Sequence, residues 1–385
     1  MNLLFYFILL LIFILIFLFS KSFNINLIIT VLCTFLIFQI IIAPKLCIDS
    51  AILGADLFFN RVFPSLFPFL VISNIIISYD GVNIYSKLFG TILCKPLRLP
   101  TSCSFVIIIS MLCGYPIGAK YACDLYANNT ISYSTYERLL SIASNASPLF
   151  IIGSVGTSML QNSVLGYLLL LSNMISCMFM SIIVPYKKIS YSTPKINSIA
   201  SKKNIGLVLK ESIDNSIKTT LSIGGFVIIF SVFINIIKSN IIFDIAISKL
   251  CILLNLPKNL IQGSLLGLIE MTNGCFLISS SSALTISKFA VISFLISFSG
   301  LSIISQVYSF TYKFKLGIRT YVIRKLFQGI ISAIVSLILY KIIYSNISIQ
   351  AFNNGNNSNN FNVAMLCFFL LLLPLIFYKL KHLFY

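Results

Sequence analysis

The chain has 385 residues, of which 58% are hydrophobic and only 9% are charged, and its formal net charge is +18. Soluble domains average roughly 25% charged residues, so the composition excludes a soluble protein and is typical of a polytopic membrane protein. Most basic residues lie between apolar runs, as they do in short membrane-protein loops, so the charge does not indicate nucleic-acid binding.

Residue usage also argues against an enzyme and against a metal site. The ten cysteines are scattered without a C-x-x-C pair, and His382 is the only histidine. We interpret the cysteines as small buried apolar residues, with no metal ligand and no disulfide among them. Walker A, H-E-x-x-H and G-x-S-x-G motifs are absent from the sequence, so no enzymatic activity and no cofactor are predicted.

Residues 1–45 are predicted to form two simple transmembrane helices, over 2–20 and 25–43. Both apolar runs are long enough to span a bilayer. The first run lacks a basic n-region and a small-residue cleavage site, so we expect a retained span and not a signal peptide.

Residues 46–186 are predicted to form a first repeat that contains broken helices. A span over 60–79 carries Pro64 and Pro68 four residues apart, which should kink it. Residues 82–98 mix basic and apolar side chains and are predicted to form an interfacial helix.

The next apolar segment, 101–127, is broken by Gly114, Pro116 and Gly118. Proline removes a backbone donor and glycine loosens a helix. In hydrocarbon each freed backbone group needs a partner, so such a break persists only where protein covers it or a polar cavity wets it. We predict a re-entrant hairpin. Lys120 at its end would either bind an anionic substrate or extend to the cytoplasmic interface, since a lysine in the membrane costs roughly 2.5–3.5 kcal/mol.

A second break is predicted just before Pro148, where Asn145 and Ser147 interrupt a helix. These side chains either help half-helix dipoles to face a ligand or only satisfy the broken backbone. A span over 164–186 closes the first repeat. Residues 187–205 are predicted to be a basic cytoplasmic linker that fixes the orientation.

Residues 206–345 repeat this plan. The predicted elements are an amphipathic segment 206–220, a span 221–237, an amphipathic helix 241–256, a hairpin 259–281, a long segment 283–310, a basic loop 311–326 and a span 327–344. An Asn-rich loop and a last transmembrane helix are predicted over 346–385.

The two repeats share a register when the sequence is shifted by about 155 positions. Ser144 then aligns with Ser299, and Ser147 with Ser302. With the linker inside, the interfacial helix of the first repeat lies inside and that of the second lies outside. The predicted fold is therefore an all-α polytopic membrane protein with two inverted repeats, re-entrant helical hairpins and broken transmembrane helices.

Polar residues at the breaks are the candidate site. Glu270 is the only acid after Asp244, and it could serve as a proton or coupling-ion site, as a partner of Lys120, or as an interfacial carboxylate. The predicted substrate-binding residues are Gly114, Tyr115, Pro116, Gly118, Lys120, Asn145, Ser147, Glu270, Thr272, Asn273, Gly274 and Ser302.

Four strings of the sequence stand out: Phe63-Pro64-Ser65-Leu66-Phe67-Pro68-Phe69, Cys113-Gly114-Tyr115-Pro116-Ile117-Gly118-Ala119-Lys120, Ser144-Asn145-Ala146-Ser147-Pro148-Leu149-Phe150 and Glu270-Met271-Thr272-Asn273-Gly274. With these strings the chain resembles the YlbJ-type (SpoVV) family of sporulation integral membrane proteins. The resemblance implies a nucleoside recognition (Gate) domain, similar to the core of concentrative nucleoside transporters. It also implies a role in endospore formation, namely moving dipicolinate from the mother cell across the outer forespore membrane.

The residues and the resemblance together predict a secondary transporter of a small anionic metabolite, with dipicolinate as the expected substrate. Expected partners are membrane lipid and a coupling ion, H⁺ or Na⁺, and the sequence leaves a homo-oligomer open. Two alternatives remain: a nucleoside-type carrier, and a non-transporting membrane assembly factor for the spore envelope.

Overall fold

The computed structural model describes residues 25–185, 204–314 and 317–344, and every regular element within these ranges is a helix. The predicted N-terminal span, most of the basic linker, the Asn-rich loop and the last transmembrane helix lie outside the described residues. The expectation of an all-α fold is confirmed for the part that the structure describes.

Two bent helix pairs precede the first hairpin. The described N-terminal helix and the first repeat together comprise α2 (Ile25–Ile42), α3 (Pro44–Leu57), η1 (Phe58–Val62), α4 (Phe63–Ser78), α5 (Gly81–Cys94), η2 (Thr101–Cys103), α6 (Ser104–Cys113), α7 (Ile117–Ala127), α8 (Tyr133–Ile142), η3 (Leu149–Met159) and α9 (Ser163–Ile183). The chain bends by 107° between α2 and α3 and by 97° between α4 and α5. The predicted interfacial helix therefore turns away sharply from the span before it.

The second repeat begins with the long helix α10. Its elements are α10 (Ile205–Lys238), α11 (Ile241–Leu254), α12 (Lys258–Ile269), α13 (Met271–Ser279), α14 (Thr285–Phe298), α15 (Gly300–Thr311) and α16 (Ile318–Leu339). Among the described residues, four helices are long and apolar enough to cross a membrane, and up to six spans result if each bent pair counts as one. The predicted span over 25–43 is found only as part of such a pair.

Two predicted boundaries are wrong. The amphipathic segment 206–220 and the span after it form one continuous helix of 34 residues, α10. The predicted loop 311–326 is partly helical, because α16 begins at Ile318. The residues Tyr321, Lys325, Gln328, Ser332 and Ser336 are buried at helical spacing along α16. The helix therefore extends through the basic residues, because its polar stripe faces the protein interior.

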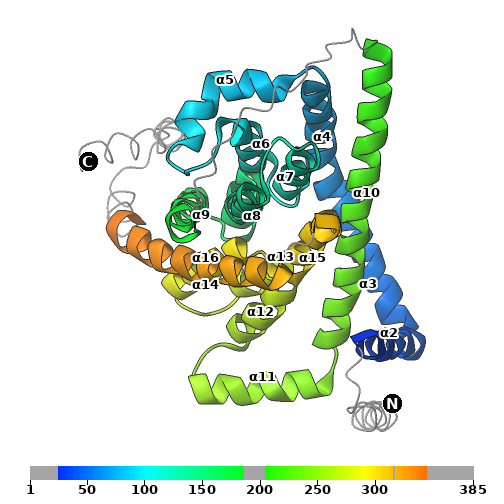
Figure 1. Cartoon of the computed structure of the whole chain (residues 1–385). Coiled ribbons are helices and arrows are strands. Elements are labelled where there is room, and N and C mark those ends of the chain that lie inside the picture. Colours follow the sequence, from blue (N-terminus) through cyan, green and yellow to red (C-terminus); the bar gives the residue numbers. More distant parts are fainter. Residues whose placement is uncertain (1–24, 186–203, 315–316, 345–385) are drawn as a thin grey trace.

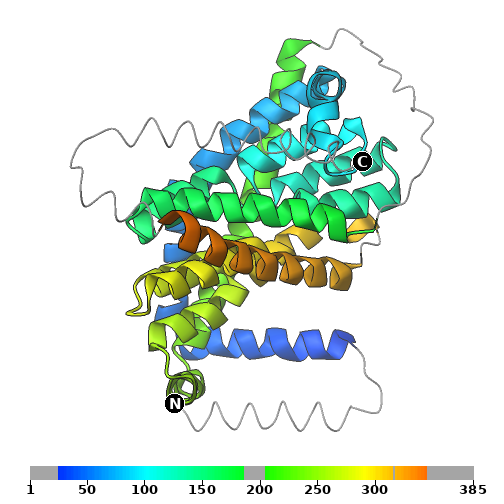
Figure 2. The same cartoon turned by 90° about the vertical axis from the view of Figure 1, so that its left-hand side faces the viewer.

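Corresponding helices of the two halves lie about 155 residues apart, as the register predicts. The helix α6 begins at Ser104 and α12 at Lys258, while α9 begins at Ser163 and α16 at Ile318. The amphipathic helices α5 and α11 lie across opposite ends of α10 in both views (Figure 1 and Figure 2). This arrangement is the one expected for inverted repeats.

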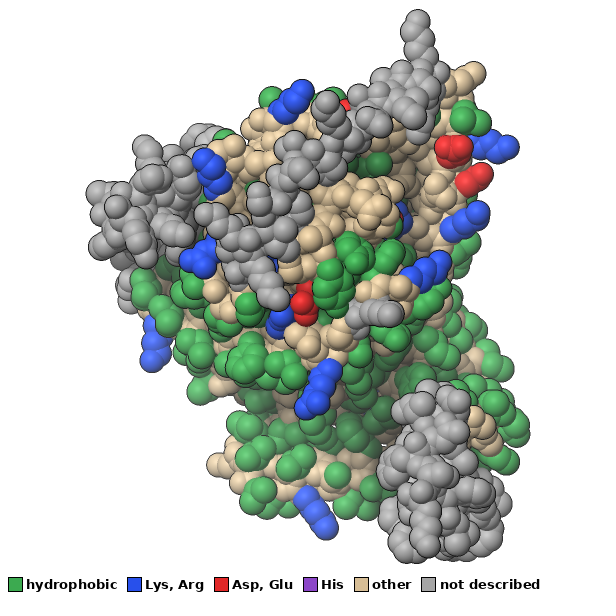
Figure 3. Space-filling model, in the orientation of Figure 1, with side chains coloured by type: hydrophobic (Ala, Val, Ile, Leu, Met, Phe, Trp, Pro, Cys, Tyr) green, Lys and Arg blue, Asp and Glu red, His purple; other side chains and the backbone are tan. Residues whose placement is uncertain are grey.

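Hydroxyl groups join three helices at the centre of the fold. The Ser293 hydroxyl of α14 lies 3.0 Å from that of Ser172 in α9 and 2.8 Å from that of Ser332 in α16. Small polar residues let membrane helices approach closely and bond across their interface. The outer surface is different: hydrophobic side chains cover much of the face in Figure 3, and the charged side chains lie mostly in its upper half.

Arg138 of α8 holds the end of α9 in place. Its buried guanidinium donates to the carbonyls of Ser181 and Val184, at the C-terminal end of α9, and to that of Leu97 at 2.9 Å. A cation suits a helix C-terminus because the last carbonyls lack intrahelical partners. The contact fixes α9 against α8, and α8 leads into the second break.

Substituting Arg138→Met should therefore lower the free energy of unfolding by about 1.5–3 kcal/mol, the usual range for losing hydrogen bonds to a charged group. Thermal unfolding of the detergent-purified protein measures this. Arg319→Met is the matched control, because Arg319 is exposed on α16. Equal melting temperatures for the two variants would show that Arg138 does not anchor α9.

Candidate functional site

The first hairpin tip packs directly against the second break. The backbone N–H of Tyr115 donates to the carbonyl of Asn145 at 2.7 Å. Gly114 has a φ of +77°, and a Cβ there would lie 2.5 Å from the backbone nitrogen of Ser147. Only glycine adopts this conformation without strain and leaves room for the neighbouring chain. The structure thus brings Gly114, Tyr115 and the adjoining Pro116 together with Asn145 and Ser147.

In the second half, the hairpin tip between α12 and α13 is stabilised by Glu270. Its carboxylate accepts from the backbone N–H groups of Thr272 at 2.8 Å and Asn273 at 2.9 Å, and from the Asn273 amide at 3.0 Å. Glu270 is therefore the N-cap of α13, where a negative charge is favoured. A Cβ on Gly300, which opens α15, would lie 3.2 Å from the Ile269 carbonyl. In the second half, too, the hairpin tip therefore contacts the break between α14 and α15.

Tyr115 joins the two halves. Its side chain is only 8% exposed, and its hydroxyl contacts the Met271 sulfur and donates to the Ile296 carbonyl at 3.4 Å. Met271 follows Glu270 directly, so the tip of the first hairpin contacts the tip of the second hairpin. Ser302 is buried one turn into α15, 3.5 Å from the Gln306 amide nitrogen.

Lys120 lies apart from these contacts. Its ammonium is 3.2 Å from the Asp124 carboxylate, one turn further along α7, and 4.4 Å from the centre of the Tyr121 ring. A pairing with Lys120 was one of the alternatives for the Glu270 carboxylate. Among the described residues Lys120 instead pairs with Asp124, and Glu270 contacts Thr272 and Asn273. Gly118 and Gly274 lie inside the two hairpins, where each meets neighbouring backbone.

A buried lysine that the sequence interpretation placed in a loop belongs to this region. The Lys325 ammonium of α16 donates to the Ser144 carbonyl at 2.6 Å and to Gln328 Oε1 at 2.8 Å. The Tyr321 hydroxyl lies 2.7 Å from the Ser144 hydroxyl. The helical spacing of Tyr321, Lys325 and Gln328 is a signal in the sequence that could have located them on one face of a helix.

Two amide side chains cross between the halves. Gln328 of α16 donates to Asn145 Oδ1 of the first half at 2.8 Å. Asn173 of α9 donates to the Ser297 hydroxyl of the second half, also at 2.8 Å. The last helix of each repeat therefore bonds the broken helix of the other, and these contacts link the breaks to the scaffold around them.

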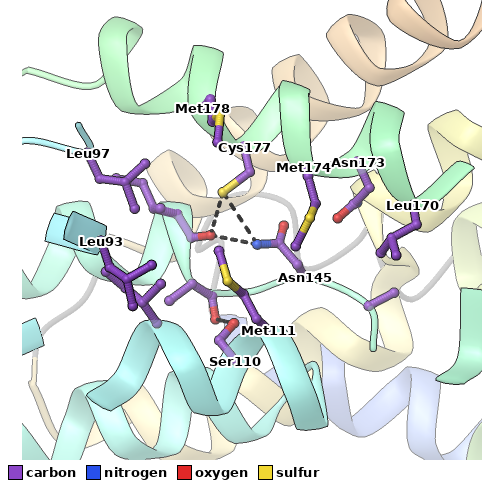
Figure 4. A pocket seen from close by; sticks show the side chains of 14 residues that line it. Leu93, Leu97, Ser110, Met111, Asn145, Leu170, Asn173, Met174, Cys177 and Met178 are labelled. Atoms are coloured by element: carbon purple, nitrogen blue, oxygen red, sulfur yellow. Dashed lines mark hydrogen bonds between the residues drawn. The ribbon is translucent and has the colours of Figure 1, made fainter. Parts of the chain in front are cut away.

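A cavity of about 50 Å³ lies beside the second break (Figure 4). Its wall is mostly apolar, with Asn145, Asn173 and Ser110 as polar members. The Asn145 amide donates to the Ile142 carbonyl at 2.7 Å, and the Cys177 thiol donates to the same carbonyl at 3.0 Å. The volume suffices for a few water molecules and is below the roughly 300–1,000 Å³ of small-molecule sites, so a ligand would require the break to move.

These contacts define a class of protein: an all-α polytopic membrane protein whose two related halves meet through broken helices at its centre. Among curated proteins the chain is similar to the sporulation integral membrane protein YlbJ of Bacillus subtilis (strain 168). The two are 27% identical over 333 residues, which cover 81% of this chain and 82% of the relative. This match supports assigning the chain to the YlbJ-type family, as its motifs predict. No protein-family model and no solved structure matches the chain.

Proposed function

We propose that the chain is a secondary transporter of a small anionic metabolite, with a central site between its two halves. The observation that carries the proposal is the contact between Tyr115 and Met271, which joins both hairpin breaks at one place. Broken backbone in membrane proteins is characteristic of substrate sites, because freed backbone groups and half-helix ends can bind ligands there. Movement of one repeat against the other would open the site to each side in turn.

We propose dipicolinate as the substrate, moved from the mother cell toward the forespore across the outer forespore membrane. The similarity to a sporulation protein supports a role in sporulation, and the polar groups of the site support an anionic substrate. Dipicolinate is a small, flat dianion, so it needs positive charge and amide donors, and Asn145, Asn173 and Lys325 supply these groups. A Gate-type core would provide the two repeats whose relative movement opens the site to each side of the membrane in turn.

Purified protein in liposomes should take up labelled dipicolinate faster than protein-free liposomes do. The test compares vesicles with a pH gradient, with a Na⁺ gradient and with neither, which also identifies the coupling ion. An excess of uridine should leave uptake unchanged, whereas competition by uridine would favour a nucleoside-type carrier. An absence of uptake in all three conditions, from correctly folded protein, would instead favour an assembly factor of the spore envelope.

A further inference from the structure

We propose that Lys325 is the counter-charge for a carboxylate of the substrate, in a site that Lys325 forms with the amides of Gln328 and Asn145. The inference rests on the proposed transport function and assigns its anion-binding residue, which the sequence motifs place instead at Lys120. Three observations carry it: the partners of the ammonium, the symmetry of the repeats, and a hydrogen-bonded link to the cavity.

The Lys325 ammonium is fully buried, and both of its acceptors are neutral. They are the Ser144 carbonyl and Gln328 Oε1, so the third N–H has no acceptor in the part of the chain that the structure describes. The adjacent Arg324 instead pairs with the Glu137 carboxylate at 3.4 Å. A lysine in a membrane interior normally pairs or lines an ion or substrate pathway. A ligand carboxylate would supply the missing negative charge.

The first repeat carries an apolar residue at the position equivalent to Lys325. At the register of about 155 residues, Lys325 of α16 corresponds to Leu170 of α9, and Gln328 corresponds to Asn173. The two amides have matching structural roles, because each bonds the broken helix of the other half. Leucine occupies the lysine position in the first repeat and packs there with 6% exposure. The cation of Lys325 therefore has no counterpart in the first repeat.

A chain of hydrogen bonds connects Lys325 to the cavity. Asn145 lines the cavity, its Oδ1 accepts from Gln328 Nε2 at 2.8 Å, and Gln328 Oε1 accepts from Lys325 at 2.8 Å. The carbonyl that holds the lysine belongs to Ser144, inside the break itself. A rearrangement of this break would therefore widen the cavity and, in the same movement, release the Lys325 ammonium from the Ser144 carbonyl. A carboxylate that reaches Asn145 could then replace the Ser144 carbonyl as the partner of Lys325.

Binding to the purified full-length protein tests the proposal, with dipicolinate and its neutral diamide, pyridine-2,6-dicarboxamide, as probes. Wild type should bind dipicolinate more tightly than the diamide. Lys325→Gln should lose at least about 30-fold in dipicolinate affinity, as expected when one partner of a buried charge pair is removed. Its affinity for the diamide should change less than threefold, and Lys325→Arg should retain the preference for the dianion. Arg319→Gln, an exposed change on the same helix, is the matched control.

Stability separates a binding role from a structural one. Lys325→Leu reproduces the residue of the first repeat and removes a buried charge, so its melting temperature should stay near that of wild type while the dianion preference is lost. Unfolding of Lys325→Leu together with normal discrimination by Lys325→Gln would overturn the proposal. Loss of discrimination in Lys120→Gln, with Lys325→Gln normal, would assign the role to Lys120. Wild-type binding without uptake would refute transport while leaving the assignment of Lys325 intact.

Discussion

Alanine at Gly118 is expected to separate the first hairpin from the second break and to abolish transport. A Cβ at this position would lie 2.0 Å from the Ala143 carbonyl oxygen and 2.8 Å from the Ser110 side chain. The Ser110 hydroxyl donates to the same carbonyl, so the backbone itself must move. Overpacking of this kind costs about 3 kcal/mol where backbone and not a flexible side chain must yield.

Thermal unfolding in detergent and dipicolinate uptake in liposomes measure the two consequences of Gly118→Ala. Gly225→Ala is the matched control, because Gly225 lies in α10 and a Cβ there meets no atom within 4 Å. Alanine at that helical position should raise stability by about 0.5–1 kcal/mol. A melting temperature of Gly118→Ala equal to that of wild type would contradict the close packing of hairpin and break.

The breaks could be predicted from the sequence because their causes are local. Glycine, proline and short polar residues interrupt hydrophobic runs at Gly114 and Pro116, and again at Asn145, so neighbouring residues alone indicate where a membrane helix ends. The structure places helix ends at these positions. The repeat was also predictable, since a shift of one half onto the other needs only the order of such interruptions.

The contacts of the charged residues could not be predicted in the same way. Basic residues before an apolar run are typical of membrane loops, so the sequence pattern predicts a loop at Lys325. The acceptor of its ammonium, the Ser144 carbonyl, lies 181 positions away. Such a pairing depends on the packing of α16 against the broken helix and has no local signal. Lys120 is the opposite case: Asp124 follows it at i+4, a helical pairing that the sequence does contain.

Alanine at Gly274 tests the second hairpin as Gly118→Ala tests the first. A Cβ at Gly274 would lie 2.3 Å from the Gly267 Cα and 2.8 Å from the Gly263 carbonyl oxygen. The arms α12 and α13 would have to separate, and Glu270 and Met271 lie at the joint between them. We therefore expect a loss of about 3 kcal/mol in stability and loss of uptake, because the Tyr115 contact depends on that joint.

Gly153→Ala is the control for this change, since its nearest neighbour would be a Leu149 methyl group at 3.8 Å. The double variant Gly118→Ala/Gly274→Ala adds a sharper test of convergence. If the hairpins meet through Tyr115 and Met271, the stability losses of the two single substitutions should not sum to that of the double variant, as is usual for coupled sites. Strict additivity would mean that each half holds its own break independently, and a single site shared by both halves would then have no physical basis.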